Sequence, residues 1–140
     1  MKLDVGWGSD PYFQKTVSTL DELDEAMTEA IAARNEDGMP LLFTVTNPSE
    51  LTPGGSVPVG LMIGVGVERA KVQWFGAGDG EGYSPDVPPW DGEPIEFDFG
   101  GVPTEETRET VRVLPGMALE AAREFMRTGR RPTCLGWFKG

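Results

Sequence analysis

The sequence predicts a single α+β domain, residues 1–140, in which two helices flank a mostly antiparallel sheet of about six strands. Two stretches, 19–36 and 116–128, repeat apolar side chains with the period of an amphipathic helix. The stretches around them alternate apolar and polar residues or form short β-branched runs, as strands do. A length of 140 residues and a hydrophobic content of 39% are sufficient for one folded core.

The first half of the chain is expected to hold two short strands, a helix and a buried strand. Leu3–Trp7 and Phe13–Val17 are the two short strands. A capping box, Thr19 to Glu22, starts the helix, and the sequence Asp37-Gly38-Met39-Pro40 ends it. The β-rich residues 41–46 follow as the buried strand.

The second half is expected to hold a hairpin, a long loop, two strands and the second helix. Val57–Val67 and Ala70–Phe75 form the hairpin. The glycine-rich and proline-rich segment Gly76–Gly92 is predicted as a loop, and loops of this length often carry function. Ile95–Phe99 alternates apolar and acidic residues, which predicts a half-buried strand.

One further segment, residues 105–114, allows two interpretations. Valines that alternate with polar residues favour a strand over Thr107–Leu114. The alternative is a helix over 105–114 with Thr104 as its N-cap. Pro115 and the β-branched content favour the strand.

The net charge of −11 is distributed unevenly. Residues 79–109 hold ten acidic residues and one arginine, and residues 20–37 hold seven acidic residues and one arginine. Residues 112–140 carry an excess of four positive charges. An acidic domain repels nucleic acid and anionic membranes and attracts basic partners, although acidity also serves solubility alone.

The sequence is expected to reside in the cytoplasm. The N-terminal residues lack the apolar region of a secretory signal, and the longest apolar run, Val57–Val67, is too short to cross a bilayer. A single cysteine, Cys134, suits a reducing compartment.

No catalytic residue, metal or cofactor is expected. The chain has no histidine, the commonest general base and metal ligand. Cys134 follows two arginines that would lower its pKa if it were exposed, but a small buried residue is the expected role. The run Gly76–Gly82 lacks the lysine and hydroxyl of a phosphate loop, and its Asp79 and Glu81 lack the further ligands of a calcium loop.

Glu96 and Asp98 share one face of their strand, where a carboxylate dyad is conceivable. Phe97 and Phe99 occupy the other face. The simpler interpretation is that the acids point outward and the aromatic residues point inward.

What remains is a surface for binding a protein. The segment from Gly76 to Glu93 combines acids with aromatic residues, the composition of binding hot spots. Alternatively, Tyr83 and Trp90 fold back to cover the sheet. The expected partner-binding residues are Asp79, Glu81, Tyr83, Asp86, Trp90, Asp91, Glu93, Glu96 and Asp98.

The C-terminal stretch Leu119–Trp137 has the most distinctive pattern in the chain. Its helix presents Phe125 on an apolar face, Gly129 is a left-handed C-cap, and Pro132 prevents the helix from resuming. The full pattern consists of Phe125, Thr128, Gly129, Arg131, Pro132 and Trp137.

This pattern resembles the end of immunity protein family 1, whose members neutralise bacterial polymorphic toxins. Members typically close with a helix that carries a large apolar residue, a turn with a small residue, an Arg-Pro pair and a tryptophan. Gly136 departs from the polar or acidic residue that often precedes the tryptophan. The resemblance implies that the six residues of the pattern serve the fold and are not contacts to a partner.

The resemblance also implies a non-enzymatic protein that binds a cognate toxin. Such proteins are commonly encoded beside toxins that are nucleic-acid deaminases or nucleases. A toxin that acts on DNA or RNA needs a basic groove, which an acidic protein can cover. We expect a DNA or RNA cytidine deaminase as the partner, blocked by residues 79–93 with strand 96–99. Immunity against a nuclease or another toxin class is one alternative, and a small enzyme or ligand-binding domain is another.

Overall fold

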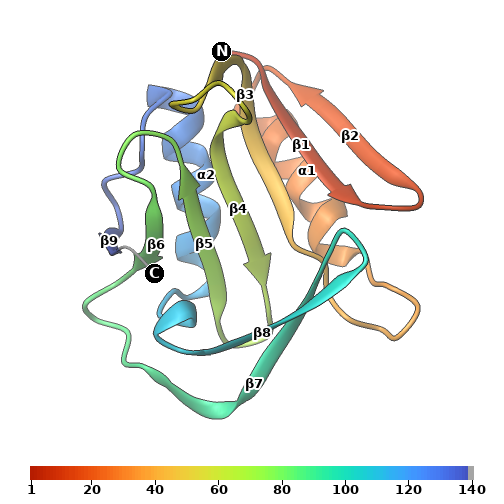
Figure 1. Ribbon diagram of the computed structural model, residues 1–140, viewed down its shortest axis with the longest axis vertical. Coiled ribbons are helices and arrows are strands. Elements are labelled where there is room, and N and C mark those ends of the chain that lie inside the picture. Colours follow the sequence, from red (N-terminus) through yellow and green to blue (C-terminus); the bar gives the residue numbers. More distant parts are fainter. Residues whose placement is uncertain (139–140) are drawn as a thin grey trace.

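The computed structural model describes residues 1–138 and confirms the predicted α+β fold (Figure 1). The two helices are α1 (Leu20–Ala32) and α2 (Pro115–Thr128), and residues Glu109–Val111 form a short 3-10 turn. The described residues form nine strands, more than the predicted six. In chain order they are β1 (Leu3–Gly8), β2 (Tyr12–Val17), β3 (Phe43–Leu51), β4 (Pro58–Val65), β5 (Ala70–Phe75), β6 (Gly80–Tyr83), β7 (Trp90–Phe99), β8 (Val102–Arg108) and β9 (Gly136–Phe138).

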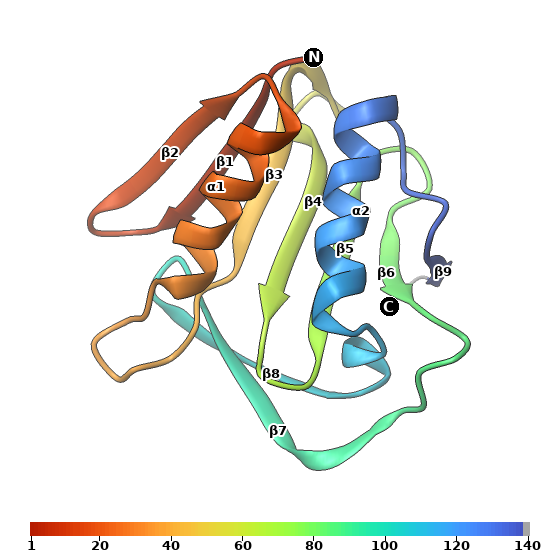
Figure 2. The ribbon, with the colours of Figure 1, turned by 180° about the vertical axis from the view of Figure 1, so that it is seen from behind.

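Seven strands form one antiparallel sheet in the order β2-β1-β3-β4-β5-β6-β9. Both helices cover the same face of this sheet, as the view from behind shows (Figure 2). The remaining strands, β7 and β8, pair with each other as an antiparallel hairpin. This hairpin lies across one end of the opposite face, near the ends of β4 and β5 (Figure 1).

Two separate apolar clusters follow from this layering. The main core lies between the sheet and the helices, with Leu61 and Val72 from the strands and Leu23 and Phe125 from the helices. A small second cluster on the opposite face contains Leu42, Met62 and Phe97, with Phe75 and Ile95 packed against it. The hairpin therefore has an apolar contact of its own and contributes no buried side chain to the main core.

Helix α1 starts as predicted and ends earlier than predicted. The capping box is present, because Glu22 N donates to Thr19 Oγ1 and Thr19 N donates to Glu22 Oε1, each at 3.1 Å. The helix ends at Ala32 and not at residue 36. The Asn35 side chain accepts hydrogen bonds from Asp37 N and Met39 N, both at 2.9 Å, and so turns the chain away from the helix axis.

Helix α2 matches its prediction within one residue. Pro115 stands in its first turn, and Gly129 ends it with a φ of 69°. Gly129 N donates to Phe125 O at 2.7 Å. Among residues 1–138, no helix is long and apolar enough to cross a membrane.

Two predictions between the helices are wrong. The segment Gly76–Gly92 is not one loop, because it contains β6 and the start of β7. Strand β6 forms between β5 and the C-terminal strand β9, and a side chain on Gly82 would collide with Leu135 and Trp137. Both interpretations of residues 105–114 fail as well, since β8 ends at Arg108 and the 3-10 turn follows.

Candidate binding surface

The β7–β8 hairpin, Trp90–Arg108, carries a dense set of carboxylates and is called the acidic hairpin below. Its acids are Asp91, Glu93, Glu96, Asp98, Glu105 and Glu106, against the single base Arg108. One side chain from each strand is buried, Phe97 of β7 completely and Glu106 of β8 to 6% exposure. The other acids of the hairpin are exposed or, for Asp98, half-buried. The hairpin thus presents most of its negative charge to solvent.

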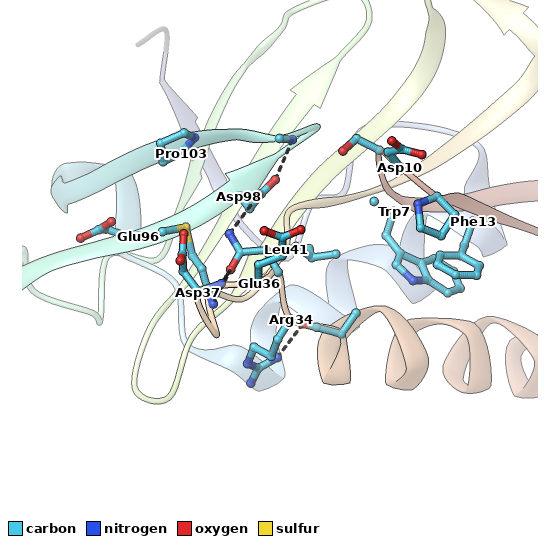
Figure 3. A pocket seen from close by; sticks show the side chains of 17 residues that line it. Trp7, Asp10, Phe13, Arg34, Glu36, Asp37, Leu41, Glu96, Asp98 and Pro103 are labelled. Carbon is cyan, nitrogen blue, oxygen red and sulfur yellow. Dashed lines mark hydrogen bonds between the residues drawn. The ribbon is translucent and has the colours of Figure 1, made fainter.

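The tip of the acidic hairpin forms one wall of a cleft of about 740 Å³, called the acidic cleft below (Figure 3). The turn between β1 and β2 and the loop between α1 and β3 form the other walls. The charged side chains that line the cleft are the carboxylates of Asp10, Glu36, Asp37, Glu96 and Asp98 and the guanidinium of Arg34.

Asp98 joins two walls of the cleft. Its backbone N donates to Pro40 O, and its backbone O accepts from Leu42 N, both at 2.9 Å. Its carboxylate accepts hydrogen bonds from Asn35 Nδ2 at 2.9 Å and from Gly101 N at 2.8 Å. Asp98 is therefore used to hold the hairpin tip against the α1–β3 loop.

The other acidic side chains of the cleft have no partner among the described residues. Inside residues 1–138, the carboxylates of Asp10, Glu36, Asp37 and Glu96 have no ion pair or hydrogen bond. Nη1 of Arg34, the single cation of the lining, donates to Ile31 O at 2.6 Å and to Ala33 O at 2.8 Å at the end of α1. The cleft consequently projects uncompensated negative charge toward solvent.

Exposed apolar side chains lie beside these acids. Phe99 and Val102 are register partners at the hairpin tip and are 49% and 62% exposed. Phe13, which is 50% exposed, stacks on Trp7 in the cleft wall with ring centroids 5.7 Å apart. The expectation that Phe99 points inward is wrong, because the hairpin tip extends past the small cluster that buries Phe97.

The predicted partner-binding acids are spread along the molecule. Asp79 and Asp86 are exposed on either side of β6, and Asp91 and Glu93 are exposed at the start of β7. The structure brings Glu96 and Asp98 together with Asp10, Glu36 and Asp37. Sequence reasoning missed these last three as binding residues, although the acid-rich segment 20–37 was a signal for two of them.

Glu81 is not part of the exposed surface, contrary to the prediction. It is 7% exposed and pairs with the ammonium of Lys71, because both side chains lie on the face of the sheet opposite the helices. Burial raises the pKa of Glu81; the hydrogen bond and charge of Lys71 oppose this rise, and the nearby Glu106 carboxylate adds to it.

The two predicted aromatic anchors fold back onto the chain. Trp90 is half-buried, its Nε1 donates to Glu93 O at 2.8 Å, and the guanidinium of Arg69 lies 5.2 Å from its ring centroid. The Tyr83 ring centroid lies 5.2 Å from the guanidinium carbon of Arg112 and 5.7 Å from the ring centroid of Phe138. Of the two interpretations offered by the sequence, these contacts favour a covering role.

Cys134 is exposed, which corrects the expectation that it is buried. Partial burial of its sulfur and the neighbouring Glu124 carboxylate raise the pKa of the thiol to about 11. Arg131 does not activate the thiol, since its guanidinium donates to Gly78 O at 2.6 Å and lies 5.7 Å from the Trp137 ring centroid. Among the described residues, no group of three His, Cys, Asp or Glu side chains is arranged to hold a metal ion.

The C-terminal pattern is built into the fold. Phe125 is fully buried and meets Trp74 edge to face, with ring centroids 5.6 Å apart. Trp137 packs against the main core, and its Nε1 donates to Pro132 O at 2.8 Å. Thr128 Oγ1 accepts a hydrogen bond from Arg130 N at 3.1 Å.

The chain is thus an α+β domain with an acidic cleft and exposed apolar side chains beside it. The family model described as immunity protein Imm1 matches residues 14–139, and the chain belongs to this immunity protein family. The match confirms the resemblance seen in the C-terminal pattern and indicates an immunity protein that acts on a toxin. No curated protein matches the chain.

Proposed function

We propose that this immunity protein neutralises a nucleic-acid deaminase toxin by covering its active site with the acidic hairpin and the acidic cleft. The observation that supports this proposal is the uncompensated charge of the cleft. Its lining holds five carboxylates and one guanidinium, and four of these carboxylates have no ion pair or hydrogen bond within residues 1–138. An acidic surface of this kind fits a groove built to hold a polyanion.

A deaminase that acts on nucleic acid binds the phosphate backbone and takes the target base out of its stack. The entrance to its active site therefore carries arginine and lysine side chains. Carboxylates held on paired strands compete with phosphates for these cations. The same charges steer the two proteins together and raise the association rate.

The proposed contact residues combine charge with apolar anchors. Phe99 and Val102 at the hairpin tip are the proposed anchors, because exposed apolar side chains ringed by charge form the centre of many interfaces. The acids proposed to surround them are Asp10, Glu36, Asp37, Asp91, Glu93 and Glu96, while Asp98 holds the hairpin tip in position. Asp79 and Asp86 extend the negative surface along β6.

Inhibition in this proposal requires binding alone, with no reaction, metal or cofactor of the immunity protein. We place it in the cytoplasm, where a toxin that modifies nucleic acid meets its substrate. Blocking the substrate path is sufficient, because the toxin cannot process a base that it cannot reach.

The decisive experiment uses the product of the neighbouring gene, where the proposal expects the toxin to be encoded. The purified toxin is incubated with single-stranded DNA and RNA, and uracil formation and strand cleavage are measured with and without the immunity protein. We expect base deamination that stops at a 1:1 molar ratio. Strand cleavage blocked at the same ratio would show that the toxin is a nuclease. No effect on either reaction at any ratio would contradict inhibition by this surface.

A further inference from the structure

Two buried side chains of the acidic hairpin contact the open face of the sheet, in addition to the hydrogen bonds that join Asp98 to the α1–β3 loop. Phe97 from β7 packs over Gly64 of β4, where a Cβ would lie 2.9 Å from the Phe97 ring. Glu106 from β8 pairs with Lys71 of β5, with 3.0 Å between Oε1 and Nζ. Gly64 and Lys71 are register partners in adjacent strands, so both attachments fall on neighbouring positions of the sheet.

The apolar attachment is independent of the main core. Phe97 packs with Leu42 and Met62 on the face of the sheet opposite the helices, and no buried residue of the hairpin belongs to the main cluster. Separating Phe97 from the sheet would expose this small cluster and leave the helix-covered face intact. The two clusters can therefore have different stabilities.

The ionic attachment has one cation for two anions. The Lys71 ammonium contacts Glu81 on β6 and Glu106 on β8, and all three side chains are at least nine-tenths buried. The second carboxylate oxygen of Glu81, Oε2, is buried and has no hydrogen-bond partner within residues 1–138. This cluster buries one negative charge more than it neutralises, which opposes docking of the hairpin.

The same arrangement lowers the electrostatic cost of separating Glu106 from Lys71. If β8 moved away, Glu106 would become hydrated and Lys71 would keep Glu81 as its partner. No unpaired ammonium would remain in the sheet, although an unpaired buried charge is the usual obstacle to breaking a buried ion pair. Glu81 thus competes with Glu106 for the cation and stabilises the separated state.

We propose that the acidic hairpin is a flap that opens from the sheet as a unit while the main core stays folded, and that Lys71 controls the opening by dividing its charge between Glu81 and Glu106. In the docked state the flap aligns Glu96 and Asp98 with the other walls of the acidic cleft. In the open state this alignment is lost.

One consequence of the flap, its effect on toxin affinity, rests on the proposed function. A docked flap presents a preorganised acidic surface, so variants that favour docking bind the toxin more tightly. Opening itself is a property of the immunity protein alone and is measured without a toxin.

The test is amide hydrogen exchange, followed by NMR, in three single variants. The reporters are two amides whose hydrogen bonds join the flap to the α1–β3 loop. Asp98 N donates to Pro40 O, and Leu42 N donates to Asp98 O, and both are called flap amides below. The amide of Leu61 in the β3–β4 ladder reports on the main core. In the wild-type protein, we expect the two flap amides to exchange at least about tenfold faster than the core amide.

The two acids of the cluster have opposite expected effects. Glu81→Gln removes the competitor of Glu106, so the flap amides should exchange about tenfold more slowly. Glu106→Gln removes the charged partner on the flap, so they should exchange about tenfold faster. Glu105→Gln removes the same charge from an exposed neighbour on β8 and should change exchange by less than about twofold.

Two results would overturn the proposal. Flap and core amides that exchange at the same rate in the wild-type protein would show that the hairpin opens only with global unfolding. Equal directions for Glu81→Gln and Glu106→Gln would show that Lys71 does not divide its charge between them. If the exchange rates change as expected but toxin affinity does not change with them, the flap opens as proposed and the proposed toxin-binding surface is wrong.

Discussion

The C-terminal tail and the acidic hairpin use their polar side chains in opposite ways. In the tail, the Glu124 carboxylate accepts hydrogen bonds from Thr133 N, Thr133 Oγ1 and Cys134 N at 2.6–3.1 Å. Arg131 and Trp137 likewise donate to backbone carbonyls. In the hairpin, most carboxylates are exposed, and the side chain of Glu96 has no partner among the described residues.

This difference explains why the family is easier to recognise than the partner. Side chains that close a helix and pack under a sheet edge must keep their chemistry for the fold to persist. Side chains that bind a partner must be left unused by their own chain. The tail therefore identifies the family, and the hairpin and cleft are where we expect the specificity for one toxin.

The largest expected effect is the loss of folding stability when a buried side chain of the tail is removed. Phe125→Ala removes a fully buried ring from between α2 and Trp74, and should lower the free energy of unfolding by about 3–5 kcal/mol. Chemical denaturation followed by circular dichroism measures this loss. The folded fraction should still bind toxin with unchanged affinity, and weaker binding by that fraction would contradict a purely structural tail.

In the hairpin, Phe97→Ala removes an equally buried ring but should lower global stability less. Local docking should weaken by about 2–4 kcal/mol, yet global stability can fall only by the free energy of docking, because the core survives flap opening. Denaturation and hydrogen exchange on the same sample separate the two quantities. If Phe97→Ala lowered the global free energy of unfolding as much as Phe125→Ala does, the hairpin and the main core would unfold as one cooperative unit.

The apolar tip of the hairpin should affect binding and not folding. Phe99→Ala should weaken toxin affinity about tenfold, because the ring is 49% exposed in the free protein and is proposed to be buried by the toxin. Calorimetry of the complex and thermal unfolding of the free protein measure the two properties. Leu51→Ala is the matched control, since Leu51 is 55% exposed and pairs with Pro58 at the start of β4, whereas the hairpin contacts Gly64 at the other end of that strand, so affinity should be unchanged.

The charges of the cleft should affect mainly the rate of association. The double reversal Glu36→Lys and Glu96→Lys should slow toxin association about tenfold at low salt and flatten its salt dependence. Stopped-flow mixing across a salt series measures both. Glu25→Lys with Glu50→Lys makes the same change in net charge at exposed positions of α1 and β3. If both pairs slow association equally, only net charge matters and the cleft has no special role.

The smallest expected effect concerns the exposed thiol of the tail. Because its pKa is raised to about 11, Cys134 should be mostly protonated at neutral pH, and its alkylation rate should still be rising above pH 10. Rates measured by mass spectrometry across pH test this. Glu124→Gln removes the nearby negative charge and should shift the profile to lower pH. A wild-type midpoint of about 8.5, the value of a free thiol, would contradict the raised pKa, and an unchanged profile in Glu124→Gln would contradict the contribution of Glu124.

Several features of the fold were predictable because their causes act within a few residues. The capping box of α1, the proline that starts α2 and the glycine that ends it are all local signals. The β4–β5 hairpin was predicted from two adjacent β-rich runs. Strand β6 was missed because its two glycines are typical of a loop and because one of its two neighbours, β9, lies more than fifty residues further along the chain.

The candidate site was predictable only in its charge. A count along the chain identified the acidic segments, and segment 79–109 does contain the acidic hairpin. The count did not separate buried from exposed acids, so Glu81 was assigned to the surface. It also did not pair the hairpin with Asp10 and Glu36, which reach the cleft from other elements.

The sequence by itself determined the family, the two helices and the excess of acid, because capping, apolar periodicity and composition depend on neighbours along the chain. Only the tertiary structure decided which acids share a cleft and which share the Lys71 ammonium. Coulomb interactions and desolvation depend on distance and burial in space, and strand pairing sets both for residues that are far apart in sequence.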